Sequence, residues 1–333
     1  MKATIKDVAR VANVSVATAS MAVNNSPKVK ASTRERILEA AKRLNYTPNT
    51  NARNLINQRS QTIGLVVTDI TNPFFGELVN EINYEVLSRG YSLLLGVSND
   101  NIQNEAAGIK KFKENRVEGV IVVPSVQEKY DLEHLYDLKS NGIPFVFSTT
   151  SYSGINADCV MCDLKKGSYL LTRHLLKKGH KKIYLFSGSK KMLFSSHRIE
   201  GYQAAFEEMG VDRSEDWIKE IFPSYDSAYA MTETLLKSVR PDAIITVNDV
   251  MAMGVLKCLK DNGMKVPGDI SVAGYDDLLY ASLLETPLTT VRQPVKEIAR
   301  KSVEVLLDKI ENGTETYETY YIDPVLKIRE TTK

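Results

Sequence analysis

The sequence predicts an α/β protein that has a small N-terminal all-α helix-turn-helix head and a two-lobed body of doubly wound parallel sheets. Residues 1 to 60 carry eleven Lys and Arg against three acids, a net charge of +8, whereas the other 273 residues, with 32 basic and 38 acidic side chains, carry −6. From residue 61 onward, runs of Val, Ile and Leu alternate with amphipathic segments, a pattern typical of parallel sheets covered by helices. A basic head on an acidic body indicates a polyanion-binding module joined to a second domain.

The composition describes an ordinary globular protein, with 43% hydrophobic and 25% charged residues. It excludes a disordered chain, a collagen and a small disulfide-stapled domain. The first residues have no apolar segment of signal-peptide type, and no run of about 18 apolar residues occurs, so we expect a cytoplasmic protein without membrane contact.

The three cysteines do not predict a metal or redox site. Cys159 and Cys162 form a C-x-x-C, but a second pair is missing, and the surrounding segment ADCVMCD reads as a strand in which the two side chains point to opposite faces. Cys258 is expected to be a core thiol.

The head is predicted to contain three helices. Residues 4–12 begin with Thr4 and have Asp7 three positions later, the spacing of a capping box. Asn13 tolerates a left-handed backbone in the following turn, and Ser15 can cap a second helix over residues 16–24. A third helix is expected to begin at Ser32, with the S-T-R-E segment as its capping box, and to end at residues 46–48.

Two short helices joined by a three-residue turn and followed by a third predict a helix-turn-helix domain over residues 1–48. A purely structural helical cap with solvated charges is the alternative that periodicity and charge leave open. Residues 49–60 are predicted to be a linker that forms a helix only when docked, because so short an isolated helix is marginal in water.

The body, residues 61–333, is predicted to contain strands within the segments TIGLVVTD, YSLLLGVS, GVIVVPS, IPFVFST, DCVMCD, KIYLFSG, AIITVND and SVAGYDD. Ligands of doubly wound sheets bind beyond the carboxyl ends of the strands. The candidate site residues are therefore those that follow the apolar runs, namely 69–75, 98–100, 125, 148–150, 187–189, 248–249 and 275–277.

The usual catalytic signatures are absent from the sequence. It contains no G-x-G-x-x-G, no G-x-x-x-x-G-K-[ST] and no G-x-S-x-G, and its four histidines are scattered. We therefore expect neither an enzyme nor a cofactor. Asn, Asp, Ser, Phe and Arg at strand ends suit a polar uncharged ligand such as a sugar, although each of these side chains can instead cap a loop.

Several motifs resemble those of the lactose/galactose-repressor (LacI/GalR) family of bacterial transcription regulators, namely TIKDVARxANVSVAT, NNSPKV, TRERILEAAKRLNYxPN, ARNL and TIGLVVTDITNPFF. The resemblance covers essentially the whole chain. It implies a homodimer that binds double-stranded operator DNA through the second helix of each head, with paired hinge helices in the minor groove. It also implies a body like the periplasmic sugar-binding proteins, with two lobes connected by three crossovers.

The resemblance implies a set of DNA-binding residues. Backbone-facing or groove-edge contacts fall on Ser15, Thr18, Ser20 and Asn24, and Leu55 corresponds to the hinge leucine that wedges into a base step. The base-reading positions are Val16, Ala17 and Met21, and Ile5 and Arg53 complete the expected DNA-binding set.

Met21 departs from the family pattern. Where this sequence has T-A-S-M, the family usually has T-V-S-R, whose arginine reads guanine through a bidentate hydrogen-bond pair. Three apolar reading residues suit thymine methyl groups. We therefore hypothesise an operator that differs from the common half-site, with specificity that depends on hinge insertion and DNA deformability. The rival hypothesis is that Met21 weakens DNA binding enough to require a second protein or a high effector level.

The resemblance also implies an effector site between the lobes, with the N-lobe at about residues 61–160 and 292–322 and the C-lobe at about 163–290 and 323–333. Closure on a ligand would rotate the lobes and change the order of the hinge segment, and both release and promotion of DNA binding occur in such proteins. The expected effector-binding residues are Asn72, Phe74, Phe75, Ser125, Arg198, Tyr225, Asn248, Asp249 and Asp276.

These observations favour a ligand-responsive transcriptional repressor whose effector is a sugar or a sugar derivative. One alternative is a cytoplasmic sugar-binding or enzymatic protein with a weakened head, which only Met21 favours. Another is a regulator with a purine or phosphosugar effector. The tail DPVLKIRETTK lacks the leucine heptads of a tetramerising coiled coil. When bound to DNA, a regulator of this kind would be associated with the nucleoid.

Overall fold

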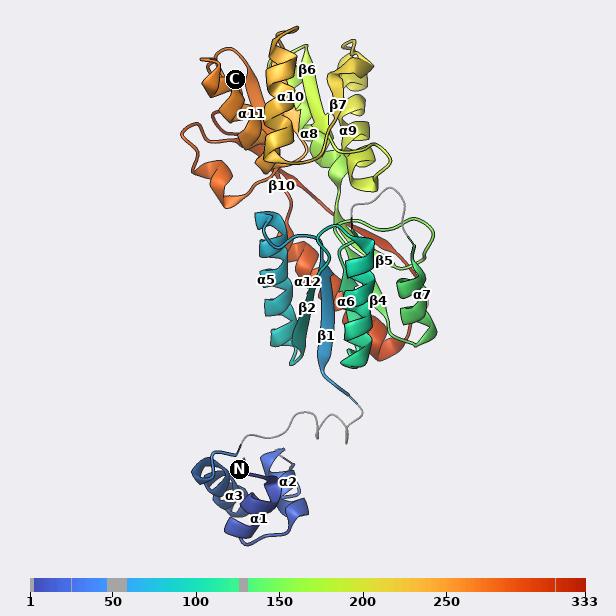
Figure 1. The fold of residues 1–333 in the computed structure, drawn as a ribbon, viewed down its shortest axis with the longest axis vertical. Helices are drawn as coiled ribbons and strands as arrows, with labels where there is room; N and C mark the ends of the chain where they lie inside the picture. The colour runs from blue at the N-terminus through green and yellow to red at the C-terminus, as the bar shows by residue number, and fades with distance from the viewer. Residues whose placement is uncertain (1–2, 25, 47–58, 126–130, 315) are drawn as a thin grey trace. The chain divides into compact units, whose positions relative to one another are not determined.

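A computed structural model describes residues 3–24, 26–46, 59–125, 131–314 and 316–333 of the chain (Figure 1). It divides into two units, Met1–Ser60, which we call the head, and Gln61–Lys333, which we call the body. Each unit has its own hydrophobic core. None of the helices in the described residues is both long and apolar enough to cross a bilayer.

The head contains three helices, α1 (Ile5–Val11), α2 (Val16–Val23) and α3 (Ala31–Arg43). The predicted capping box of α1 is confirmed, since the backbone N and Oγ1 of Thr4 both donate to Asp7 Oδ2, at 3.0 and 2.7 Å. Asn13 has φ 50° in the turn, and Ser15 caps α2 by accepting a hydrogen bond from Thr18 N at 3.1 Å. The core that joins the helices is made of small and β-branched side chains, including Val8, Ala9, Ala12, Ala19, Ala22 and Ile37.

The predicted capping box of the third helix is wrong. Helix α3 begins at Ala31, and Lys30 is its N-cap without a side-chain cap. The carbonyl of Lys30 already accepts a hydrogen bond from Arg34 N at 3.0 Å, so Ser32 lies inside the first turn. Arg34 also donates through its guanidinium to the carbonyl of Ser26, which fixes the preceding loop.

The first sheet of the body is entirely parallel, with the strand order β11-β5-β4-β3-β1-β2. Because the chain steps in opposite directions from β1 to β2 and from β2 to β3, right-handed crossovers place the two connecting helices on opposite faces. Accordingly, α5 packs with α12, and α6 packs with α7. The elements of this N-lobe are β1 (Thr62–Val67), α5 (Pro73–Ser88), β2 (Ser92–Val97), α6 (Ile102–Glu114), β3 (Gly119–Val122), α7 (Glu133–Ser140), β4 (Phe145–Ser148), β5 (Asp158–Cys162), α12 (Val295–Asn312) and β11 (Thr319–Ile322).

The second sheet has the order β12-β10-β9-β8-β6-β7 and is parallel except for β12. Helix α8 packs with α9, and α10 with α11. The elements of this C-lobe are α8 (Leu164–Lys177), β6 (Ile183–Ser187), α9 (Leu193–Met209), η1 (Glu215–Trp217), β7 (Ile218–Glu220), α10 (Tyr225–Leu236), β8 (Ala243–Thr246), α11 (Asp249–Asp261), β9 (Ser271–Asp276), η2 (Leu279–Ser282), β10 (Thr289–Arg292) and β12 (Val325–Lys327).

Helices α8 and α9 approach each other closely at Gly201. A Cβ atom at this position would lie 2.0 Å from the backbone oxygen of Lys165, so only glycine fits between the helices.

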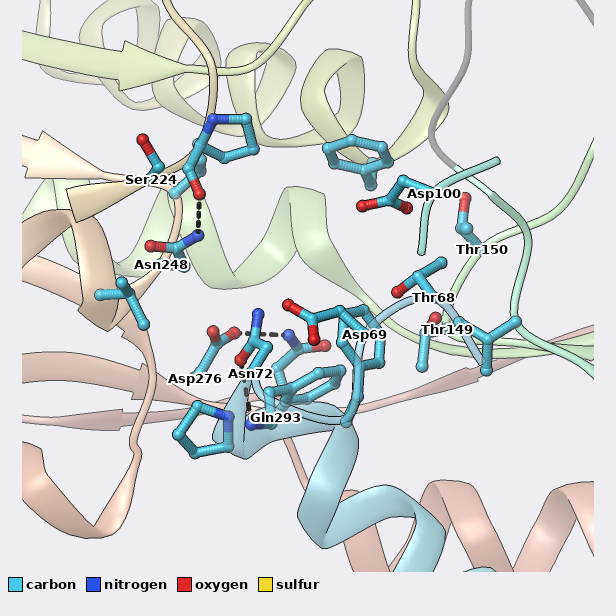
Figure 2. Close-up of a pocket in the computed structure, with 18 of the residues that line it drawn as sticks. Thr68, Asp69, Asn72, Asp100, Thr149, Thr150, Ser224, Asn248, Asp276 and Gln293 are labelled. Carbon is cyan, nitrogen blue, oxygen red and sulfur yellow. Dashed lines mark hydrogen bonds between the residues drawn. The ribbon is translucent and has the colours of Figure 1, made fainter. Parts of the chain in front are cut away.

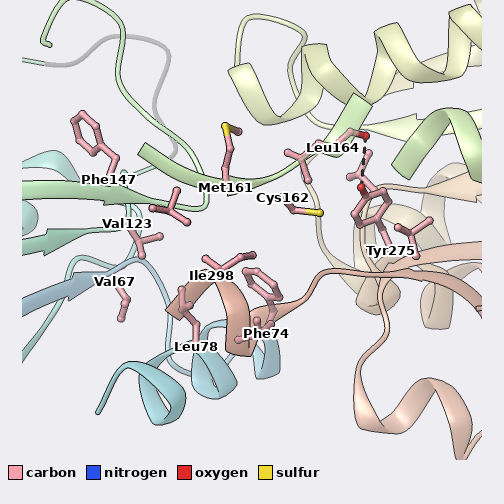
Figure 3. Packing of buried hydrophobic residues seen from close by; sticks show 14 of the residues in the cluster. Val67, Phe74, Leu78, Val123, Phe147, Met161, Cys162, Leu164, Tyr275 and Ile298 are labelled. Carbon is pink, nitrogen blue, oxygen red and sulfur yellow. Dashed lines mark hydrogen bonds between the residues drawn. The ribbon is translucent and has the colours of Figure 1, made fainter. Parts of the chain in front are cut away.

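The chain passes between the two sheets three times: from β5 to α8, from β10 to α12 and from β11 to β12. One continuous core of buried side chains includes both lobes and the crossover after β5 (Figure 3). Cys159 and Cys162 are buried in this core, and the predicted core thiol Cys258 is also buried. Burial raises the pKa of Cys159 and of Cys162 to about 12, so both remain thiols. No cluster of metal-ligating side chains occurs in the described part of the chain.

Candidate effector cleft and recognition helix

A cavity of about 370 Å³ lies at the carboxyl ends of the strands of both sheets (Figure 2). This volume suits a small organic ligand. Ligands of doubly wound sheets bind at this position, beyond the carboxyl ends of the strands. The wall is formed by Thr68, Asp69, Thr71, Asn72, Pro73, Phe74, Phe75, Asp100, Val123, Pro124, Thr149, Thr150, Leu164, Phe194, Arg198, Phe222, Pro223, Ser224, Tyr225, Val247, Asn248, Val250, Asp276 and Gln293.

The N-lobe side of the wall combines a helix start with two phenyl rings. Asn72 is the N-cap of α5 and accepts a hydrogen bond from Phe74 N at 3.1 Å, and Pro73 occupies the first helical position. The rings of Phe74 and Phe75 meet edge to face, with centroids 5.2 Å apart. Because the Asn72 side-chain oxygen serves the helix, its amide Nδ2 is the part of this side chain that can donate to a ligand.

Arg198, on α9, supplies the only cationic side chain of the wall among the described residues. The residue is 6% exposed, and its guanidinium carbon lies 4.3 Å from the centre of the Tyr275 ring. Its Nη1 donates to the carbonyl of Phe194 at 3.1 Å, while its buried Nε has no hydrogen-bond partner in the described part of the chain. A buried guanidinium with an unused donor is suited to an oxygen-rich ligand.

Asp276 lies at the end of β9 and faces the same cavity. Gln293 Nε2 donates to its Oδ1 at 2.7 Å. Its φ of 114° is unusual for a residue other than glycine, and such backbone strain is concentrated at functional sites. Burial raises the pKa of Asp276 to about 7, although the charge of Arg198 and the hydrogen bond from Gln293 oppose this rise. At neutral pH this carboxyl can therefore both accept and donate hydrogen bonds.

The remaining C-lobe wall comes from the starts of two helices. Asn248 caps α11 by accepting from Met251 N at 2.7 Å, and its Nδ2 reaches the carbonyl of Pro223 at 3.4 Å. Ser224 caps α10 by accepting from Ser227 N at 3.2 Å. Tyr225 is the first residue of α10 and contributes to the wall.

Two of the predicted effector-binding residues do not line the cavity. Asp249 is fully buried: its Oδ2 accepts from Leu278 N at 2.8 Å and its Oδ1 from Thr290 Oγ1 at 2.6 Å. Burial raises its pKa well above the usual value. Ser125 Oγ donates to Glu105 Oε2 at 2.8 Å and lies 2.9 Å from Ser98 Oγ, and both of these partners are buried within the N-lobe. Both side chains follow a strand, but they turn into the protein instead of the cleft.

Sequence reasoning missed several residues of the wall. Gln293 follows β10, and the segment TTVR did not predict a strand there. Residues that follow this segment were therefore not among the candidate site residues. Phe222 and Ser224 follow the three-residue strand β7, which was also not predicted. Phe194 lies in the first turn of α9, one turn before Arg198, and no sequence signal distinguished it.

The predicted base-reading helix α2 contains no charged side chain. Ser15, Val16 and Ala17 are exposed at its start, and Val16 is 43% exposed. Met21 is half-buried and packs against the head core, as Ile5 does at the start of α1. Thr18 and Ser20 are half-buried and Asn24 is the exposed C-cap. The predicted hinge contacts Arg53 and Leu55 lie outside the described residues.

A three-helix head with a helix-turn-helix and a two-lobed body with a cleft at its strand ends define a ligand-binding protein joined to a DNA-binding domain. Two family models match this division: "Bacterial regulatory proteins, lacI family" over residues 4–49, and "Periplasmic binding proteins and sugar binding domain of LacI family" over residues 60–330. The chain belongs to the LacI family of DNA-binding transcription regulators, which are not enzymes.

Individual relatives extend over the whole chain. The chain is 34% identical to the HTH-type transcriptional repressor PurR of Vibrio parahaemolyticus over 332 residues, which cover 99% of each protein. It is 31% identical to the ribose operon repressor of Haemophilus influenzae over 330 residues, which cover 98% of each. Among solved structures, a lac repressor dimer bound to operator and the anti-inducer ONPF matches with a TM-score of 0.89 at 26% identity, covering 100% of this chain and 99% of the other.

Proposed function

We propose that this protein is a homodimeric transcriptional repressor whose affinity for operator DNA is controlled by an unphosphorylated sugar bound in the cleft. The observation that carries the proposal is the cleft wall, which combines the buried Arg198 and Asp276 with amide donors and phenyl rings. Sugar hydroxyls both donate and accept hydrogen bonds, and the apolar faces of a sugar ring suit aromatic side chains.

The charge of the wall favours a neutral ligand over a phosphosugar. Three carboxyl groups, those of Asp69, Asp100 and Asp276, line the cavity (Figure 2). Arg198 is the only cation of the wall within the described part of the chain. A phosphate group carries more than one negative charge at neutral pH. It would therefore enter a cavity whose carboxylates repel it and whose single guanidinium is already close to Asp276.

A purine base is the second candidate, and the number of phenyl rings favours it. Phe74, Phe75, Phe194 and Phe222 all belong to the wall, and a planar base can stack on such rings. Arg198 and Asn72 could donate to the ring nitrogen and carbonyl acceptors of a base. The relatives named above include both PurR and a ribose operon repressor, so both ligand classes belong in the first screen.

A thermal-shift screen tests the ligand class. Free pentoses and hexoses, their phosphates and purine bases are compared at concentrations up to 10 mM. A ligand at 100 times its dissociation constant stabilises the folded protein by about 2.7 kcal/mol. The proposal expects stabilisation by at least one free sugar and none by its phosphate. Stabilisation by a base alone would favour the second candidate, and stabilisation by the phosphate alone would contradict both.

For DNA binding we propose that α2 enters the major groove, with Val16, Ala17 and Met21 toward the bases. Ser15, Thr18, Ser20 and Asn24 would contact the backbone or the groove edge, with Ile5 nearby and with Arg53 and Leu55 acting from the hinge segment. The support is the family membership and the exposed start of α2. The basic residues of the head would contact phosphates, so DNA affinity should fall steeply with salt, with a slope of about −0.9 per neutralised phosphate.

We also propose that the body forms the dimer and that its division into lobes follows the two sheets. The exposed large apolar side chains of the body include Tyr84 and Leu87 on α5, and Leu279 and Leu283 at η2, which are 71% and 69% exposed. Apolar surface of this kind typically marks an interface. Sedimentation of the wild type and of Leu283→Glu tests this, and the variant should be a monomer.

The proposed location of the protein is the bacterial cytoplasm, on the nucleoid when DNA is bound.

A further inference from the structure

A buried carboxylate lies behind the N-lobe wall of the cleft and does not touch the cavity. Glu105, in the first turn of α6, is fully buried. Its Oε2 accepts hydrogen bonds from Ser125 N at 2.9 Å, Ser125 Oγ at 2.8 Å and Tyr152 Oη at 2.8 Å. Its Oε1 lies 2.9 Å from His134 Nε2 on α7.

These bonds connect the loops that follow β2, β3 and β4, three strands of the first sheet. Ser125 follows β3, and Tyr152 follows β4. Ser98, directly after β2, is joined to them because Ser125 Oγ lies 2.9 Å from Ser98 Oγ. One carboxylate therefore fixes three strand-end loops that are separate in the sequence.

The same three loops form much of the N-lobe wall. Asp100 lies two residues after Ser98, Pro124 directly precedes Ser125, and Thr150 lies two residues before Tyr152. Each hydrogen-bonded residue is one or two positions from a wall residue, so a shift of the first also moves the second. A binding site must be held within about 0.5 Å of its productive geometry to bind well.

Hydrogen-bonding groups surround the Glu105 carboxyl. Backbone N–H, hydroxyl and phenol groups donate to Oε2, and His134 Nε2 lies within hydrogen-bond distance of Oε1. Burial and the charge of Glu105 raise the pKa of Tyr152, so the phenol keeps its proton and remains a donor. Among the described residues, the basic partner of Glu105 is His134.

We propose that Glu105 is the positioning residue of the N-lobe half of the cleft, and that His134 holds it from the opposite side. Glu105 orders the loops after β2, β3 and β4 before the ligand arrives, so the ligand meets a preformed wall. This inference rests on the proposed ligand site for its functional meaning, but the ordering itself is a property of the ligand-free protein. It also explains why Ser125 follows a strand yet points away from the cavity.

Hydrogen–deuterium exchange of the ligand-free protein tests the ordering. Glu105→Gln keeps the size of the side chain but replaces one acceptor oxygen by a donor. We expect amides of residues 98–101, 123–125 and 149–152 to exchange at least tenfold faster than in the wild type. The wild type is measured in enough urea to give it the same global stability as the variant. Asp137→Asn, which removes the surface ion pair between Lys113 and Asp137 on the same two helices, is the matched control.

Two further variants separate positioning from general stabilisation. His134→Ala should speed exchange of the three loops, whereas His134→Gln, whose amide can donate near the position of Nε2, should restore the slow exchange. Equal exchange in Glu105→Gln and the stability-matched wild type would overturn the inference, as would equal exchange in the two His134 variants.

Ligand binding then tests the functional meaning, with D-ribose and hypoxanthine as probes. The affinity of Glu105→Gln for the probe that binds should fall at least tenfold, while Asp137→Asn should match the wild type. Unchanged affinity would overturn the positioning role. If neither probe binds the wild type, these two ligands are excluded and the wider thermal-shift screen decides the ligand class, while the exchange experiment decides this inference by itself.

Discussion

Replacing Met21 by arginine should give the head a guanine preference that the wild type lacks. Helix α2 has no charged residue, and its exposed start presents the methyl groups of Val16 and Ala17. Met21 follows Ala17 by one helical turn and is half-buried against the head core. The wild-type helix therefore offers van der Waals contacts at these three positions, which suit thymine methyl groups and provide no bidentate donor.

The expected magnitude follows from the contact that the variant adds. An Arg–guanine bidentate pair contributes about 1–3 kcal/mol of discrimination, which is about 5- to 140-fold in affinity at 25 °C. The arginine stem can keep part of the packing of Met21 on the core while its guanidinium extends into the groove. We expect the loss of head stability to be below about 1.5 kcal/mol, which a urea titration measures.

Selection of binding sites from random duplex DNA provides the assay for wild type, Met21→Arg and the apolar control Met21→Leu. The base pair whose preference changes between wild type and Met21→Arg identifies the position that residue 21 reads. Fluorescence anisotropy with all four base pairs at this position then gives the affinities. For the wild type and Met21→Leu, the affinity for the site with guanine should exceed the affinity for the other three sites by less than about threefold. Strong selection of guanine by the wild type, or no change in Met21→Arg, would refute the reasoning.

Three further outcomes are expected. Arg198→Lys should weaken ligand binding at least tenfold by calorimetry, because an ammonium lacks the planar fork; unchanged affinity would exclude a guanidinium contact. Folding raises the pKa of Asp276 from 3.8 to about 7, so the folded state binds its proton more tightly. The unfolding free energy of the wild type relative to Asp276→Asn should therefore fall as pH rises from about 4 to about 7, by up to about 1.4 kcal/mol per pH unit; a flat or rising difference would contradict the shift. Gly201→Ala places a Cβ 2.0 Å from Lys165 O and should destabilise the body by about 1–3 kcal/mol in urea. The control Gly76→Ala, whose Cβ has its nearest neighbour at 3.7 Å, should be neutral or stabilising, and equal effects would refute the packing argument.

The fold was predictable because its signals are local. Runs such as TIGLVV and SVAGYD are buried over nearly their whole length as strands, as apolar continuity predicted. The three-residue strands β7 and β12 were not predictable, since IKE and VLK carry too little periodicity to distinguish a strand from a loop.

The position of the cleft could be predicted from the sequence, but the side chains that line it could be predicted only in part. The strand-end rule identified the edge of the sheet where Asn72, Arg198 and Asp276 meet. It did not determine which polar side chains turn into the cleft, because that depends on partners distant in sequence. Ser125 is held by a glutamate 20 residues away and Asp249 by a threonine 41 residues away.

Helix capping and ligand binding can use different atoms of the same amide side chain. Asn72 and Asn248 each use their oxygen to cap a helix while they line the cavity. The sequence had presented capping and binding as alternatives for such residues, whereas one amide can cap with its oxygen and offer its nitrogen to a ligand. This arrangement also fixes the donor direction, because the cap orients the whole amide.

Ligand-dependent operator binding tests the central claim most directly. The operator obtained by selection is titrated with wild type and with Arg198→Lys, each with and without the sugar that stabilises the wild type. A coupling free energy of about 1–3 kcal/mol between two sites corresponds to a change of about 5- to 150-fold. We expect such a change in operator affinity for the wild type and less than about twofold for Arg198→Lys at the same sugar concentration. If operator affinity stays the same in the wild type when the cleft is saturated, the bound sugar does not control DNA binding.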